Sequence, residues 1–138
     1  MMPHINCVLE TALYVDNLDR AVRFYRDVLC LRVIDTSARL VAMDAGQATV
    51  LLLFRRGATA NGAQTPTGWV PPHDGTGPIH IAFAIAADQM AEWERHLAEQ
   101  GVTIESRIAR EAGGGRLYFR DPDGHSVELA TPGTWPTY

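Results

Sequence analysis

The sequence lacks the features that mark several classes of protein. Only two of its 138 residues are cysteines, Cys7 and Cys30, too few for a disulfide framework and without the spacing of a zinc site. The longest apolar run, Val50–Phe54, is far shorter than a membrane span. Twelve basic residues against 16 acidic ones give a net charge of −4, which argues against nucleic-acid binding. Residues 1–4 show no export signal, so we expect a cytoplasmic protein.

The chain is 46% hydrophobic and long enough for one compact domain, residues 1–138. Within it, the alternating pattern of Glu10–Val15 returns 70 residues later as His80–Ile85, and each leads into a helical pattern. Two further strands then follow in each half, at Leu40–Gly46 with Thr49–Arg55 and at Leu117–Gly124 with Ser126–Thr131. The implied unit, used twice, is a strand, a helix and then three strands, the last two being those just named. The sequence therefore predicts an α+β fold of two βαβββ modules in one chain.

The modules have predictable limits. We expect module one over about residues 7–57, a Gly-, Pro- and Thr-rich loop over 58–77, module two over about 78–132 and a tail over 133–138. The loop is expected to lack regular structure, and the aromatic tail is expected to pack against the domain. The helices are predicted over Leu18–Leu29, capped by Asp16 or Asn17, and over Gln89–Gln100, capped by Asp88 and ended by Gly101.

Strand alternation sorts the side chains between the two faces of each sheet. The bulky apolar side chains must pack under the helices, so the opposite faces carry Glu10, His80 and Glu128, flanked by small residues. A buried carboxylate without a partner is costly, and a divalent cation would neutralise two of them. One imidazole and two carboxylates suit Fe²⁺, Mn²⁺, Ni²⁺, Co²⁺ or Zn²⁺. The alternative for each residue alone is a solvated glutamate or a structural histidine.

Two motifs carry a family resemblance. Residues 13–29, LYVDNLDRAVRFYRDVL, and residues 118–128, YFRDPDGHSVE, resemble the vicinal oxygen chelate superfamily, which includes glyoxalases, bleomycin resistance proteins and extradiol dioxygenases. The resemblance covers about residues 7–132. It implies curled mixed sheets that form a metal cleft, and a homodimer in which Glu10 of one chain faces His80 and Glu128 of the other. His80 and Glu128 match the family's usual ligands, whereas Glu10 stands where His or Gln is more common.

Three departures from the family pattern bear on the reaction. Glu10 in place of a second histidine weakens the case for an extradiol dioxygenase. Leu52 stands where glyoxalase I has a fourth ligand, which favours an open site and argues against an ordinary glyoxalase I. Ala12 stands where a fosfomycin-type transferase would have a threonine, so that assignment is weakened too.

Four further side chains are candidates for the site. Tyr118 matches a substrate-contacting tyrosine of the fosfomycin-resistance relatives, and we predict a catalytic role as hydrogen-bond donor or acid/base, the alternative being simple packing. Tyr14 shares the face of Glu10, Arg120 shares that of Tyr118, and His73 could reach the site from the loop. These three are predicted to bind substrate, although His73 could also be an exposed loop histidine and Tyr14 only part of the cleft wall.

Two functions follow as hypotheses. The first is a metal-dependent enzyme with lyase, isomerase or dioxygenase chemistry, in which two adjacent oxygens of a small substrate chelate the ion. The alternative is a metal-free small-molecule-binding protein of the bleomycin resistance type, whose aromatic surfaces would be supplied by Tyr14, Trp69, Tyr118 and Trp135.

Overall fold

The computed structural model describes all residues of the chain, 1–138, as two compact units. The first unit is Met1–Thr76 and the second is Gly77–Tyr138, and each is described by itself. Neither α-helix has the length and apolar character that crossing a membrane requires.

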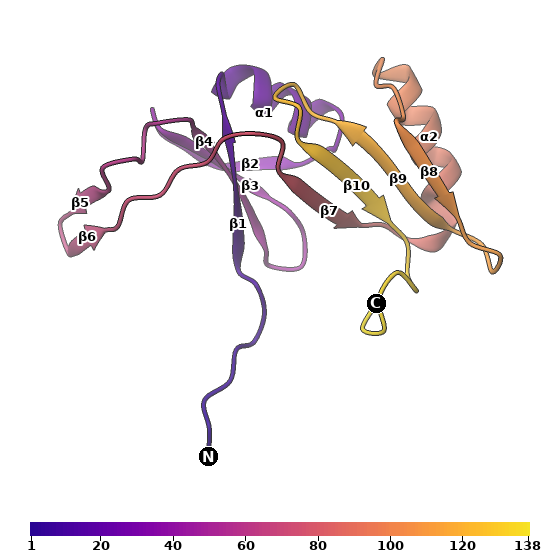
Figure 1. Ribbon diagram of the computed structural model, residues 1–138, viewed down its shortest axis with the longest axis horizontal. Coiled ribbons are helices and arrows are strands. Elements are labelled where there is room, and N and C mark those ends of the chain that lie inside the picture. The colour runs from indigo at the N-terminus through magenta and orange to yellow at the C-terminus, as the bar shows by residue number, and fades with distance from the viewer. The chain divides into compact units, whose positions relative to one another are not determined.

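The first unit contains a four-stranded sheet with one helix (Figure 1). Its strand order is β1-β4-β3-β2, with β1 and β4 parallel and the other neighbours antiparallel. The elements are β1 (Glu10–Val15), α1 (Leu18–Asp27), β2 (Arg32–Thr36), β3 (Leu40–Asp44) and β4 (Val50–Arg55).

The second unit repeats this topology. Its order β7-β10-β9-β8 again joins the first and last strands in parallel and the remaining strands antiparallel. The elements are β7 (His80–Ala84), η1 (Ala87–Gln89), α2 (Met90–Glu99), β8 (Ser106–Ala109), β9 (Gly115–Arg120) and β10 (Ser126–Ala130). The prediction of two βαβββ modules in an α+β fold is therefore confirmed.

The helices differ slightly from their predicted limits. Asn17 caps α1 by accepting a hydrogen bond from the Arg20 amide at 2.9 Å, and the helix ends two residues earlier than predicted, with Val28 as its C-cap. The predicted Asp88 cap of α2 is wrong. Asp88 lies inside the 3₁₀ turn η1, where side-chain capping is absent, and the α-helix starts only at Met90. Gly101, at φ +71°, follows its C-terminus as predicted.

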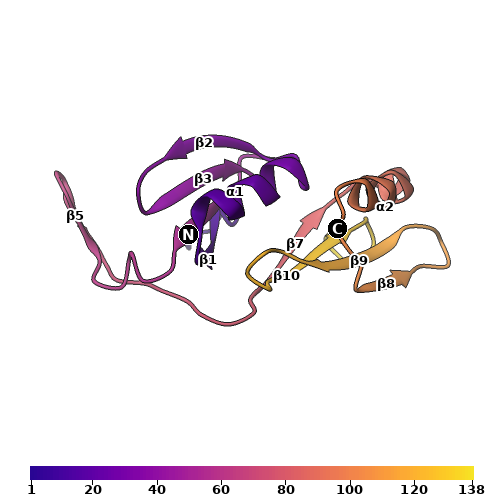
Figure 2. The ribbon, with the colours of Figure 1, turned by 90° about the horizontal axis from the view of Figure 1, so that it is seen from above.

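In each unit the helix lies along one face of its own sheet (Figure 2), and the fully buried strand side chains are apolar. In the first unit the buried face is formed by β1, β3 and β4, and α1 buries Ala21 and Tyr25. In the second unit it is formed by β9 and β10, and α2 buries Leu97. Fully buried strand residues on these faces are Leu13, Val15, Met43, Leu51, Leu53, Leu117, Phe119, Val127 and Leu129. The opposite face of each sheet carries the predicted functional residues.

The segment predicted to be an unstructured loop contains a small hairpin. Strands β5 (Ala63–Thr65) and β6 (Gly68–Val70) pair antiparallel, so the expectation of about twenty residues without regular structure is wrong in part. Thr65 stabilises the two-residue turn, because its hydroxyl donates to the Gly68 carbonyl at 2.6 Å. Figure 1 shows this hairpin extending away from the sheet of the first unit.

Candidate metal-binding site

The open face of the second sheet brings His80, Glu128 and Tyr118 together. Across the β10–β7 ladder, Ser126 pairs with His80 and Glu128 with Ala82, and across the β10–β9 ladder Glu128 pairs with Tyr118. Since residues directly opposite one another point to the same side, all three side chains share one face. The alternation of the sequence predicts this arrangement.

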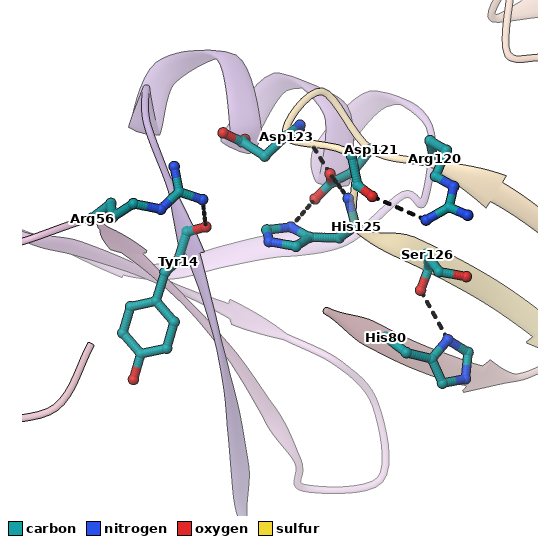
Figure 3. Close-up of polar contacts among 9 residues, drawn as sticks. Tyr14, Arg56, His80, Arg120, Asp121, Asp123, His125 and Ser126 are labelled. Atoms are coloured by element: carbon teal, nitrogen blue, oxygen red, sulfur yellow. Dashed lines mark hydrogen bonds and ion pairs between the residues drawn. The ribbon is translucent and has the colours of Figure 1, made fainter. Parts of the chain in front are cut away.

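His80 and Glu128 form a close pair on this face. The His80 Nε2 lies 3.2 Å from the Glu128 Oε1, and the carboxylate is almost entirely buried, with 7% of its side chain exposed. The other ring nitrogen, Nδ1, lies 3.0 Å from the Ser126 carbonyl (Figure 3). A carbonyl oxygen can only accept, so Nδ1 carries a proton and donates it. In neutral His80, the Nε2 lone pair therefore faces a carboxylate.

That arrangement needs a positive charge between the two groups. Either a second proton on Nε2 or a bound cation removes the repulsion between a lone pair and a carboxylate oxygen. A backbone carbonyl that accepts from Nδ1–H is one of the common partners that orient a metal-binding histidine. A separation of 3.2 Å between the two ligand atoms also suits two neighbouring ligands at roughly 2.1 Å from one ion. The residues present thus fit a divalent ion, and their binding it stays a prediction.

Glu10, the third predicted ligand, lies in the first unit. It is the exposed first residue of β1 and is the counterpart of His80 in the internal repeat. Leu52 pairs with Ala12 as Glu128 pairs with Ala82, so the repeat places a leucine where the second unit has its buried carboxylate. Within either unit, no three His, Cys, Asp or Glu side chains surround one point. The participation of Glu10 stays a prediction.

Tyr118 lies close to groups that change the pKa of its phenol. Burial, and then the charge of the nearby Glu128 carboxylate, raise the pKa of its phenol, and the charge of Arg116 opposes that shift. Its ring lies stacked near the His80 imidazole, with centroids 6.4 Å apart. Because the pKa is raised, the phenol is protonated at neutral pH and can donate a hydrogen bond beside the candidate ligands.

Tyr14 and His73 meet on the open face of the first sheet. The Tyr14 hydroxyl lies 2.6 Å from the His73 Nδ1, and the imidazole packs edge-on against Phe54 with centroids 4.7 Å apart. His73 is half-buried, and its backbone amide donates to the Thr59 carbonyl at 3.1 Å. Burial, and then the charge of Asp74, raise the pKa of Tyr14. His73 therefore reaches this face, and its role in binding substrate stays a prediction.

The segment around His73 is held by specific backbone contacts. Arg56 donates to the Gly75 carbonyl at 3.1 Å and to the Tyr14 carbonyl at 3.0 Å, and it also pairs with Asp16. A Cβ atom on Gly75 would lie 2.4 Å from the Tyr14 ring, so only glycine permits the segment to lie this close.

Arg120 lies on the same side of the second sheet as Tyr118. Its guanidinium contacts both carboxylate oxygens of Glu105, at 2.7 and 3.1 Å, and donates to the Gly124 carbonyl at 3.1 Å. The arginine is thus already engaged by two acceptors, and its contact with substrate stays a prediction.

The turn after β9 contains a buried pair that sequence reasoning missed. The Nδ1 of His125 lies 2.8 Å from the Asp121 Oδ2, and neither side chain is exposed (Figure 3). The other Asp121 oxygen accepts from the amides of His125 and Asp123. An aspartate followed four residues later by a histidine was the available signal in the sequence, but the burial of the pair could not be predicted from it.

The fold and motifs agree with comparison to known proteins. The sequence model of one protein family, the Glyoxalase/Bleomycin resistance protein/Dioxygenase superfamily, matches residues 3–129 of this chain. The chain belongs to this superfamily. The resemblance drawn from the two motifs is therefore confirmed.

Relatives within the superfamily have different activities by name. The chain is 32% identical to lactoylglutathione lyase from Haemophilus influenzae, covering 88% of this chain and 90% of that protein. It is 31% identical to metallothiol transferase FosB from Shouchella clausii, covering 92% and 81%. A match to FosB from Bacillus licheniformis has 42% identity but covers only 38% of this chain and 34% of that protein. Among solved structures, a lactoylglutathione lyase from Agrobacterium tumefaciens superposes with a TM-score of 0.85 at 30% identity, covering 96% of this chain and 98% of that one.

The raised pKa of Tyr118 gives a measurable prediction. In a titration of phenolate absorbance, Tyr118→Phe is expected to remove a component that ionises above pH 10, the ordinary value. As pH rises past 10 the unfolded chain loses this proton before the folded one, so the wild type should lose stability there and the variant should lose less. Removal of a component at or below pH 10 would contradict the assigned environment.

Proposed function

We propose that this protein is a divalent-metal-dependent enzyme that acts on a small oxygenated molecule. The observation that carries the proposal is the His80–Glu128 pair, in which a carbonyl-fixed imidazole presents Nε2 to a buried carboxylate at 3.2 Å. The names of the relatives, a lyase and a metallothiol transferase, support an enzyme over a structural protein. Fe²⁺, Mn²⁺, Ni²⁺, Co²⁺ and Zn²⁺ are the candidate ions for this ligand set.

Glu10 is the proposed third ligand, supplied by a second copy of the chain in a homodimer. Two observations support this choice. The second unit offers no third acid or histidine to the pair, and Glu10 occupies the position of the first unit that corresponds to His80. Two carboxylates would balance the charge of a divalent ion.

The surrounding residues favour the proton-transfer chemistry of a lyase or isomerase. When bound, the ion would supply a Lewis acid for two adjacent substrate oxygens. Tyr118, protonated at neutral pH, would donate a hydrogen bond or a proton to substrate from the side of Glu128. Ala82, Ala84 and Ala130 leave space above the sheet for the substrate. An extradiol dioxygenase would normally have a second histidine in place of one carboxylate.

Metal content tests the proposal directly. Protein purified without chelators is expected to contain about one divalent ion per chain by elemental analysis. Stripping the ion with EDTA and returning it at 100 times its Kd should stabilise the fold by about 2.7 kcal/mol, roughly a 10 °C rise in Tm. The five candidate ions should be compared in parallel, with Mg²⁺ as a control for nonspecific stabilisation.

The alternative function gives the opposite result. Protein without bound metal, whose Tm none of the five ions changes, would contradict the proposal. Small-molecule binding that is indifferent to EDTA would then support a metal-free binding protein.

A further inference from the structure

A cavity of about 300 Å³ lies on the open face of the second sheet, beside His80 and Glu128. Its floor is made of small side chains, Ala82, Ala84 and Ala130, so the sheet itself leaves room for a ligand. Arg116, Trp135 and Tyr138 supply its other notable walls. The cavity is therefore formed by both the candidate ligands and groups that metal binding does not require.

The C-terminal tail is fixed in place as one wall. The Tyr138 hydroxyl donates to the Ile85 carbonyl at 2.9 Å, and the Thr134 hydroxyl donates to the Thr131 carbonyl at 2.8 Å. The Gly133 amide donates to the Tyr138 carbonyl and closes the tail into a loop. Trp135 nevertheless remains 69% exposed while lining the cavity. A held but uncovered indole offers a surface on which a planar or apolar group can pack.

Arg116 differs from neighbouring arginines of the same sheet. Arg107 pairs with Glu94 at 3.4 Å and Arg120 pairs with Glu105 at 2.7 Å, so both are neutralised by carboxylates. Arg116 lines the cavity half-buried and has no carboxylate at ion-pair distance. Its guanidinium can therefore accept an anionic partner from outside the protein.

We propose that this cavity selects an anionic substrate, with a carboxylate or phosphonate group bound by Arg116 and a planar or apolar portion packed on Trp135. The chelating oxygens would then lie toward His80 and Glu128, and this last contact rests on the proposed function. The charge balance supports an anion: a divalent ion would be neutralised by Glu10 and Glu128, which leaves the charge of Arg116 uncompensated. The two adjacent oxygens belong to the proposed function, and the anionic group is what Arg116 adds to it.

A pair of matched probes tests this selection. Both 3,4-dihydroxybenzoate and 4-methylcatechol carry the same two adjacent oxygens and ring, but only the first has a carboxylate. The wild type is expected to bind the benzoate about tenfold more tightly by titration calorimetry. Arg116→Gln should reduce that preference to about twofold or less, and Arg116→Lys should retain part of it. A 3,4-dihydroxyphenylphosphonate probe, compared with the benzoate, assigns the head group.

The control is Arg107→Gln, the same change of charge on the opposite face of the same sheet, which should keep the tenfold preference. Trp135→Ala should weaken both probes about equally. Equal affinity of the wild type for the two probes, no binding of either, or loss of the preference in Arg107→Gln would overturn the proposal. Measuring with and without Mn²⁺ separates the two ideas: a charge preference without metal binding supports the anion site alone, and metal binding without preference supports the metal site alone.

Discussion

Glu128→Gln is expected to lower the affinity of the protein for the proposed divalent ion by about 100-fold or more. Glutamine keeps the size of the side chain but removes the anionic oxygen, and an amide is a poor substitute for a carboxylate ligand of these ions. Glu128 is also the most buried of the proposed ligands, so water cannot easily replace its charge. Titration calorimetry on EDTA-stripped protein with Mn²⁺ and Zn²⁺ measures the change.

The metal-free stability of the same variant separates a ligand from a structural ion pair. If Glu128 is a metal ligand, its buried charge destabilises the metal-free fold. Glutamine should then leave the free energy of unfolding of the metal-free protein unchanged or raise it. If the contact with His80 is a structural salt bridge, glutamine should destabilise the metal-free protein and leave ion binding intact, which would contradict the proposal. Glu94→Gln is the matched control, since Glu94 is a partly buried carboxylate paired with Arg107.

Strand alternation predicted the faces of both sheets at the level of single residues. The side-chain period of a strand is two, so assigning Leu13 to the buried face assigns Ala12 and Tyr14 to the other. The internal repeat then assigned His80 and Ala82 to the corresponding face of the second sheet. The His80–Glu128 contact follows from this, because the two residues lie on adjacent strands of one ladder.

The contacts that sequence reasoning missed depend on segments without a period. Tyr14 and His73 are 59 residues apart in the sequence, and Arg56 donates a hydrogen bond to the backbone at Gly75, close to both. The buried state of His125 depends on tertiary packing that no local pattern encodes. Asp88 was predicted as a cap from its residue type, but a preceding 3₁₀ turn moved the helix start past it. Glu10 was placed on its face correctly, and its part in binding a metal ion stays a prediction.

The second large effect is expected at the turn that begins β9. A Cβ atom added at Gly115 would lie 2.0 Å from the Ile108 carbonyl oxygen, and the backbone φ of Gly115 is +146°. Gly115→Ala must therefore move the β8–β9 ladder, and we expect the free energy of unfolding to fall by about 3 kcal/mol or more, measured by urea denaturation.

Gly113→Ala separates steric overlap from backbone conformation. Gly113 also has positive φ, +95°, but nothing lies within 4 Å of its added Cβ, so its loss should be about 1 kcal/mol. Equal losses in the two variants would contradict the overlap at Ile108. The position also bears on function, because Arg116 follows Gly115 directly and Tyr118 lies two residues further along the same strand. A displaced β9 should thus weaken binding of the anionic probe even in the fraction of protein that remains folded.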